Sequence, residues 1–428
     1  MLEPPAGRLT KGLWLSFFAL ALCSTAFVFG QTRQEGAASA SVIQEMIDRA
    51  PDGAELVIPP GNYVGNLKIE KSITLDGQNS VTIDANGSGT VIQLFSNNVT
   101  LRNLRLANSG EDHNAEDAGI QIRGSGNVVK DVVIENTLFG MTLEKSDNNV
   151  IRRNKISSRP RDLGLRGDAL KLWYSNGNKV EDNEIVNSRD IVLWYSRNNH
   201  LTGNSSSGGR YGLHFMYAVD NLVENNRFFD NSVGVSLMYS VGDVVRNNYI
   251  AKSTGATGTC VSLKEASGVT IENNDILYCA TGIYLDLSPF EPGTKDIITG
   301  NRISYNDIAI SFLNDWRDNV FKDNILRSNM TEVVVFGGGG AHKNEWDGNA
   351  WESYEGFDRD KDGIGDTPQR LYNYAGLVWM EVPNTRFFKD TPVLEVLDFL
   401  DRLAPFSEPR LLLEDKRPLM NKGKASRS

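Results

Sequence analysis

The chain has 428 residues, a formal net charge of −10 at pH 7 and 40 glycines. This acidic balance, together with the lack of a basic stripe, argues against nucleic acid as a partner. Because a solenoid lengthens by adding repeats, the length does not require several globular domains.

The N-terminus, residues 1–30, has the pattern of a secretory signal peptide. Arg8 and Lys11 precede an apolar run over residues 13–29, and a small-residue cleavage site ends at Gly30. We expect cleavage and export to a bacterial periplasm. Retention of the run as a membrane anchor is the alternative.

The chain has three cysteines, and Cys23 leaves if the signal peptide is removed. Cys260 and Cys279 then remain, about one repeat apart. A disulfide in an oxidising compartment and a role as two small core residues both fit this spacing.

Residues 31–40 are expected to form a linker, and Ser41–Arg49 a short amphipathic helix. A stack of strands exposes apolar side chains and unpaired backbone at its open end. We therefore expect this helix to cap a β-helix that spans residues 41–336. Insertions at residues 108–117 and 157–166 are expected to form loops on one edge of it.

A short sequence motif repeats along residues 149–326. It consists of Asn, any residue, an apolar residue, any two residues, Asn, any residue and an apolar residue. The alternation of apolar residues within each motif predicts strands. Steps of 21 to 29 residues predict one stacked unit per repeat. The fold class that follows is all-β, a right-handed parallel β-helix with a short N-terminal capping helix and a C-terminal extension. The second asparagines, expected to form a ladder between coils, are Asn154, Asn183, Asn204, Asn226, Asn248, Asn274, Asn301 and Asn324.

Four central strands end in Trp-Tyr or Met-Tyr and align at residues 170–174, 191–195, 213–217 and 235–239. Their first and third positions are apolar and are expected to point inward. The fourth position reads, from coil to coil, Glu144, Trp173, Trp194, Met216, Met238, Lys264 and Asp286. Charged side chains cannot lie unpaired in a dry core, so this column is expected to face outward. Its Trp-Trp-Met-Met stretch, which includes Trp173 and Trp194, predicts a binding face.

His214 lies two residues before Met216, and therefore on the same face of its strand. Met216 and Met238 are expected on adjacent coils, about 4.8 Å apart. One imidazole and two thioethers suit Cu(I) better than Zn²⁺, Mg²⁺ or Ca²⁺. We expect an open, three-coordinate Cu(I) site at His214, Met216 and Met238. The alternative is that the methionines form a protein contact and His214 is an ordinary surface residue.

An acidic segment near residue 360 has the spacing of a calcium loop. Positions one, three, five, six and nine are Asp358, Asp360, Asp362, Gly363 and Asp366. Position twelve is Gln369, which lacks the bidentate carboxylate of an EF-hand. We expect a weak structural Ca²⁺ loop, with a solvated acidic turn as the alternative.

Residues 337–391 are expected to form an acidic and aromatic extension that contains this loop. Residues 392–428 follow as an amphipathic helix, residues 392–403, and a basic tail. We expect the helix to cover the last coil, because an open end must be covered. Docking on a partner is the alternative.

Residues 188–196, 209–218 and 231–240 resemble the NosD family, periplasmic maturation proteins of nitrous oxide reductase. Residues 346–351 and 356–366 fit the same family. The resemblance implies a non-enzymatic, periplasmic accessory protein that helps to supply copper. It also implies work with an ABC transporter, an ATPase plus a membrane subunit, and with nitrous oxide reductase or another copper protein.

The rival hypothesis is an enzyme, because parallel β-helices also host polysaccharide lyases, hydrolases and epimerases. Candidate carboxylates are Glu144, Glu265, Asp286 and Asp315. Trp173 and Trp194 would then stack on sugars. A scaffold that docks on the transporter without binding copper is a third hypothesis.

Overall fold

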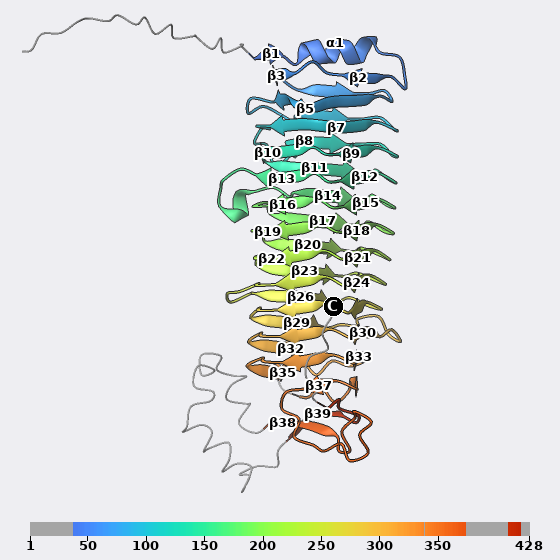
Figure 1. Cartoon of the computed structure of the whole chain (residues 1–428), viewed down its shortest axis with the longest axis vertical. Helices are drawn as coiled ribbons and strands as arrows, with labels where there is room; N and C mark the ends of the chain where they lie inside the picture. The colour runs from blue at the N-terminus through green and yellow to red at the C-terminus, as the bar shows by residue number, and fades with distance from the viewer. Residues whose placement is uncertain (1–36, 338, 374–409, 421–428) are drawn as a thin grey trace, which may run out of the picture. The chain divides into compact units, whose positions relative to one another are not determined.

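The computed structural model describes residues 37–337, 339–373 and 410–420 (Figure 1). The expected signal peptide at residues 1–30 and the expected C-terminal helix at residues 392–403 lie outside these residues. Within the described residues, no helix is long and apolar enough to cross a membrane.

The chain winds into coils whose strands stack in parallel on the strands of the preceding and following coil (Figure 1). The all-β parallel β-helix expected from the repeat is therefore confirmed. One wall is a 12-stranded sheet formed by β4 (Leu67–Ile69), β6 (Ile92–Leu94), β8 (Ala118–Ile122), β11 (Phe139–Glu144), β14 (Leu170–Trp173), β17 (Asp190–Trp194), β20 (Tyr211–Met216), β23 (Val233–Met238), β26 (Thr259–Lys264), β29 (Thr281–Asp286), β32 (Ile308–Phe312) and β35 (Thr331–Val335).

Two further ladders of parallel strands are joined into one 25-stranded sheet through the long strands β5 and β7. Its strands are β1 (Ala38–Ser39), β2 (Glu55–Val57), β3 (Gly61–Val64), β5 (Thr74–Asp84), β7 (Thr100–Ala107), β9 (Val128–Lys130), β10 (Val133–Thr137), β12 (Val150–Arg152), β13 (Lys155–Ser158), β15 (Lys179–Glu181), β16 (Glu184–Val186), β18 (His200–Thr202), β19 (Ser205–Ser207), β21 (Leu222–Glu224), β22 (Arg227–Phe229), β24 (Val244–Arg246), β25 (Tyr249–Ala251), β27 (Thr270–Glu272), β28 (Asp275–Leu277), β30 (Asp296–Thr299), β31 (Arg302–Ser304), β33 (Asn319–Lys322), β34 (Ile325–Arg327), β36 (Glu345–Asp347) and β37 (Ala350–Trp351).

The repeated asparagines form the expected ladder inside the turns. The backbone N–H of Asn183 donates to Oδ1 of Asn204 at 3.0 Å, and that of Asn204 donates to Oδ1 of Asn226 at 2.8 Å. Nδ2 of Asn204 also donates to the carbonyl of Val180 at 2.8 Å. The buried amides thus satisfy backbone groups that the sharp turns leave without a strand partner.

Both ends of the stack are covered. The expected helix is α1 (Ser41–Arg49), which buries Ile43 and Ile47 over the first coil. At the other end, β38 (Gln369–Asn373) pairs antiparallel with β39 (Arg410–Asp415). Asp415 accepts hydrogen bonds from Nδ2 of Asn349 at 2.9 Å and from Nε1 of Trp351 at 3.0 Å. Asp415 therefore ends the asparagine ladder with a carboxylate.

Cys260 and Cys279 form a disulfide with their Cα atoms 5.8 Å apart. Both residues are buried. Of the two possibilities left open by their spacing, the structure contains the disulfide, and its two sulfurs are not free thiols.

Candidate metal site

The fourth-position column runs down the outside of the 12-stranded sheet in direct register. Trp173 pairs with Trp194, Trp194 with Met216, and Met216 with Met238, through β14, β17, β20 and β23. All four side chains are partly exposed, whereas the inward neighbours Leu213, Phe215, Val235 and Leu237 are fully buried. The register predicted from the Trp-Tyr and Met-Tyr endings is thus confirmed.

His214 lies on β20 between the inward residues Leu213 and Phe215, and so faces the same side as Met216. It is only 8 % exposed, so it is less accessible than the open site expected from the sequence. The ring of Tyr211 stacks on the imidazole with centroids 4.5 Å apart. A β-bulge explains this cover, because Asp190 pairs with Tyr211 while Val192 already pairs with His214. The extra residue re-aims the start of β20.

The carboxylate of Asp190 lies near Nδ1 of the imidazole. Its Oδ2 lies 3.9 Å from Nδ1 of His214, and its Oδ1 accepts a hydrogen bond from the backbone of Tyr211 at 3.1 Å. Arg210 pairs with the same carboxylate. Burial alone would raise the pKa of Asp190, but the nearby imidazole of His214, the Arg210 guanidinium and the backbone N–H of Tyr211 together outweigh burial and lower the pKa. A negative charge is therefore fixed beside Nδ1.

Three buried polar atoms on this face have no hydrogen-bond partner among the described residues: Nε2 of His214, Oγ of Ser236 and Nε1 of Trp194. His214 and Ser236 are register partners, and Trp194 is the register partner of Met216. A buried polar group without a partner costs about 1–3 kcal/mol. Such groups call for an explanation, and a bound cation would account for Nε2 of His214 and Oγ of Ser236, but not for the indole N–H of Trp194, which can only donate. The free Nε2 and the two thioethers are the donor types that Cu(I) prefers, so these residues fit that ion.

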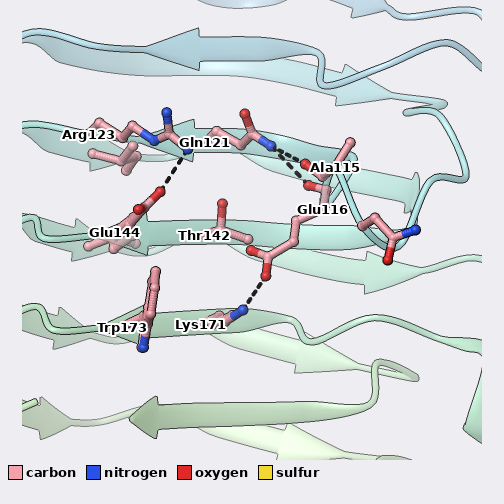
Figure 2. A pocket seen from close by; sticks show the side chains of 11 residues that line it. Ala115, Glu116, Gln121, Arg123, Thr142, Glu144, Lys171 and Trp173 are labelled. Atoms are coloured by element: carbon pink, nitrogen blue, oxygen red, sulfur yellow. Dashed lines mark hydrogen bonds and ion pairs between the residues drawn. The ribbon is translucent and has the colours of Figure 1, made fainter. Parts of the chain in front are cut away.

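A polar hollow of about 180 Å³ continues the same face beyond Trp173 (Figure 2). Arg123 pairs with Glu144 at 2.7 Å, and Lys171 pairs with Glu116 of the insertion at residues 108–117. The two insertions lie together, since Glu111 accepts from both Arg159 and Arg161 at 2.5 Å. The outward face thus changes from charged to apolar and sulfur-bearing along the stack.

The carboxylates considered for an enzyme are not gathered at one place. Asp286 is separated from Glu144 by six register steps, about 29 Å at 4.8 Å per strand. Asp286 pairs with Lys264 at 3.9 Å, and Asp315 pairs with Lys343 at 2.5 Å. Glu265 occupies a turn with φ of 47°. Glycosidase carboxylates lie about 5–9.5 Å apart, so Glu144 and Asp286 do not form such a pair.

A tyrosine ladder borders the apolar part of the column. Tyr174, Tyr195, Tyr217 and Tyr239 stack with successive ring centroids 4.9, 4.9 and 4.8 Å apart. Each occupies a turn residue with positive φ, which directs its ring away from the strand. Tyr174, Tyr195 and Tyr217 are about 40 % exposed or more. Together with the Trp-Trp-Met-Met column they form an aromatic and thioether surface.

The acidic loop brings three of its four aspartates together. Carboxylate oxygens of Asp358, Asp360 and Asp362 all lie within 4.8 Å of one another. The N–H of Gly363 donates to Asp358 at 3.0 Å, and φ of Gly363 is 87°. Asp366 instead accepts from the backbone of Arg359 at 2.9 Å. The acidic loop is far in sequence from the proposed copper ligands, so it is a separate candidate metal site.

Asp190 and Tyr211, which lie beside His214, were not among the residues predicted from the sequence. Asp168 pairs with Arg189 at 2.9 Å, and Asp190 pairs with Arg210 one coil later. This Asp-to-Arg spacing of 20 or 21 residues is readable in the sequence. The bulge that brings Asp190 to His214 has no such signal, because it shifts the register by one residue.

A family model described as "Periplasmic copper-binding protein (NosD)" matches residues 158–356, a range that includes His214, Met216 and Met238. A protein of Pseudomonas aeruginosa named "Probable ABC transporter binding protein NosD" is 25 % identical over 429 residues, covering 87 % of this chain and 89 % of its own. One of Stutzerimonas stutzeri with the same name is 26 % identical over 427 residues, covering 86 % and 88 %.

Among solved structures, the A-module of mannuronan C-5 epimerase AlgE6 of Azotobacter vinelandii matches with a TM-score of 0.56 and 17 % identity. The match covers 74 % of this chain and 96 % of that one. The Dettilon tailspike protein matches with a TM-score of 0.50 and 13 % identity, covering 67 % and 68 %. At such identities the likeness concerns the fold alone.

Proposed function

The chain belongs to the NosD family of periplasmic copper-binding proteins, and on this premise we propose that it carries Cu(I) at His214, Met216 and Met238. We further propose that it works with the ATPase and membrane subunits of an ABC transporter. The ion would be delivered for the copper sites of nitrous oxide reductase.

The observation that carries this proposal is the register pair Met216–Met238 beside an imidazole nitrogen without a partner. The two methionines face each other across β20 and β23. His214 is on the same face, and its Nε2 is buried and unpaired within the described part of the chain. Metal-binding histidines commonly have one ring nitrogen oriented by a carboxylate while the other binds the metal. The nearby charge of Asp190 fits that arrangement.

The donor set favours Cu(I) over other ions. Thioether sulfur is a soft ligand, and it binds Zn²⁺, Mg²⁺ and Ca²⁺ poorly. The disulfide removes Cys260 and Cys279 as thiolate ligands. The two thioethers are partly exposed, so a donor or acceptor protein can approach the ion from their side, while His214 lies buried against the ring of Tyr211. A site that hands on its ion needs that access.

The aromatic surface beside the site supports docking of a partner. Trp173, Trp194 and the tyrosine ladder are partly exposed and form one continuous strip beside the methionines. Aromatic residues and methionine are enriched at the centres of protein interfaces. We propose that the copper donor or acceptor contacts this strip. An ion could then pass between proteins without release to solvent.

The test is a Met216→Leu, Met238→Leu double variant, because leucine keeps the volume and apolarity of methionine but removes the sulfur. Cu(I) affinity should fall by roughly 10-fold or more for each lost thioether, about 1.4 kcal/mol each. Copper loading of the reductase in cells should fail. Met141→Leu is the matched control, since Met141 is fully buried in the core. Normal copper binding and loading by the double variant would instead assign the methionines to a metal-free docking surface.

The enzyme alternative is less well supported. Its acidic candidates on the column are separated by six register steps, and the apolar stretch lies between them. Release of unsaturated or epimerised sugar products from acidic polysaccharides by the purified protein would nevertheless overturn the copper proposal in favour of this class.

A further inference from the structure

Trp194 lies on the strand next to the one that carries Met216. It precedes Met216 in the outward column and is its direct register partner across β17 and β20. Neighbouring parallel strands are about 4.8 Å apart. The tryptophan is therefore on the coil next to the proposed site, on the side opposite to Met238.

The orientation of the indole follows from the tyrosine ladder. The rings of Trp194 and Tyr195 are nearly parallel, with an interplanar angle of 14°. Tyr195 in turn stacks face to face on Tyr217 of the next coil, with an angle of 5° and centroids 4.9 Å apart. The faces of these rings are thus directed along the stack of coils. The π face of Trp194 is consequently turned toward the coil that carries Met216.

Trp173, one coil further away, is oriented differently. Its ring is tilted by 59° from that of Tyr174, although Tyr174 is itself nearly parallel to Tyr195. Trp173 instead lines the polar hollow shown in Figure 2. The parallel arrangement with the ladder is therefore a property of Trp194 and not of every tryptophan in the column.

The indole nitrogen of Trp194 adds a second observation. Nε1 is buried and has no hydrogen-bond partner within the described residues. The ring is thus held by packing and not by a polar anchor.

We propose that Trp194 closes one side of the copper site by placing its π face over the Cu(I) ion, as a cation–π contact. This inference rests on the proposed function and names a further specificity-determining residue for it. His214, Met216 and Met238 supply the lone pairs, while the indole shields the ion from water on the side of the preceding coil. A cation over a tryptophan face is stabilised by the ring quadrupole, most strongly when the contact is desolvated.

This arrangement has a consequence for selectivity and for transfer. The indole forms no coordinate bond, so it adds affinity without adding a ligand that must be broken on release. The indole also shields the ion from solvent until the partner protein binds. A strongly hydrated ion such as Zn²⁺ would have to lose water to enter the same position, which disfavours it.

The experiment is an anaerobic titration of the full mature protein with Cu(I) alone, followed by tryptophan fluorescence and by competition with a Cu(I) chelator. We compare the wild type with Trp194→Phe, Trp194→Leu and Trp316→Phe. The chain has seven tryptophans, so the variants are needed to assign the signal. Trp316 is the matched control, because it lies outside the outward column. Its Nε1 donates a hydrogen bond to the carbonyl of Pro289, with a donor–acceptor distance of 2.7 Å.

We expect one equivalent of Cu(I) to quench the wild type and Trp316→Phe by the same absolute amount, and to leave Trp194→Phe nearly unchanged. Affinity should fall by roughly 2- to 30-fold in Trp194→Leu and by less in Trp194→Phe, which keeps a weaker π face. Zn²⁺ should cause no such quenching.

Two results would overturn the inference in distinguishable ways. If Cu(I) binds through the methionines but quenching and affinity are the same with and without Trp194, the indole plays no part and the proposed function stands. If wild-type protein binds no Cu(I) at all, both fail. The conservative Trp194→Phe variant keeps the result interpretable if Trp194→Leu does not fold.

Discussion

Nδ1 of His214 lies 3.9 Å from Oδ2 of Asp190, a residue on the preceding coil that is only 3 % exposed. The carboxylate is fixed by Arg210 and by the backbone of Tyr211, so it cannot follow the imidazole if the ring rotates. We expect Asp190 to act as a positioning residue that favours the Nδ1–H tautomer of His214 and leaves Nε2 available to a metal.

Replacing Asp190 with Asn should weaken Cu(I) binding. The amide keeps the shape of the side chain but removes the charge that favours the Nδ1–H tautomer. Loss of a residue that orients a metal-binding histidine typically costs about 10- to 100-fold in affinity. Chelator competition measures the change. Because lost ion pairing with Arg210 also affects stability, thermal unfolding should be recorded in parallel.

Asp168→Asn is the matched control for this experiment. Asp168 pairs with Arg189 one coil earlier, in the same arrangement as Asp190 with Arg210. Burial raises the pKa of Asp168 to about 6. This variant should keep wild-type Cu(I) affinity. Equal loss in both variants would mean that the carboxylates stabilise the sheet edge and do not position the imidazole.

The repeat in the sequence predicts which residues are neighbours on adjacent coils. Met216 and Met238 could be placed as neighbours because the β-helix keeps the same residue of each motif in register. The outward face of His214 was predicted correctly, but its burial was not, because the bulge between β17 and β20 inserts one residue and brings Tyr211 over the ring. Contacts such as that of Asp190 depend on this local departure from the repeat, which alternation of apolar residues does not encode.

Calcium should stabilise the C-terminal part of the structure if the acidic loop binds it. Carboxylates of Asp358, Asp360 and Asp362 converge, and the N–H of Met420 donates to the carbonyl of Gly363 at 3.0 Å. An ion would therefore fasten the segment that follows Asp415. EDTA should lower the thermal midpoint of unfolding, and Ca²⁺ should restore it.

The double variant Asp360→Ala, Asp362→Ala should remove this difference between chelated and calcium-loaded protein. Mg²⁺ added at the same concentration serves as the control ion, since it demands a more regular octahedron. A midpoint in wild-type protein that is the same with EDTA and with Ca²⁺ would identify the loop as a solvated acidic turn.

Asp243 replaces asparagine in one of the buried ladders, and this makes stability depend on pH. Its Oδ1 accepts from both the backbone N–H and Nδ2 of Asn221 at 2.9 Å. Burial raises the pKa of Asp243 to about 7. The folded chain thus holds the proton more tightly than the unfolded chain, whose aspartates titrate near 3.9. The stabilisation is full below that value and is lost as pH rises toward 7.

We expect Asp243→Asn to raise the thermal midpoint at pH 8 and to have a smaller effect at pH 5. Between these values the charge should cost the wild type about 2–3 kcal/mol that the variant does not lose. Asparagine is already present at the equivalent positions Asn199 and Asn221, where Nδ2 donates to a serine carbonyl. Asp182→Asn, at an exposed turn, is the control for replacing an aspartate outside the core. If Asp243→Asn lowers the midpoint equally at both pH values, the site requires a carboxyl group, and charge burial does not limit stability there.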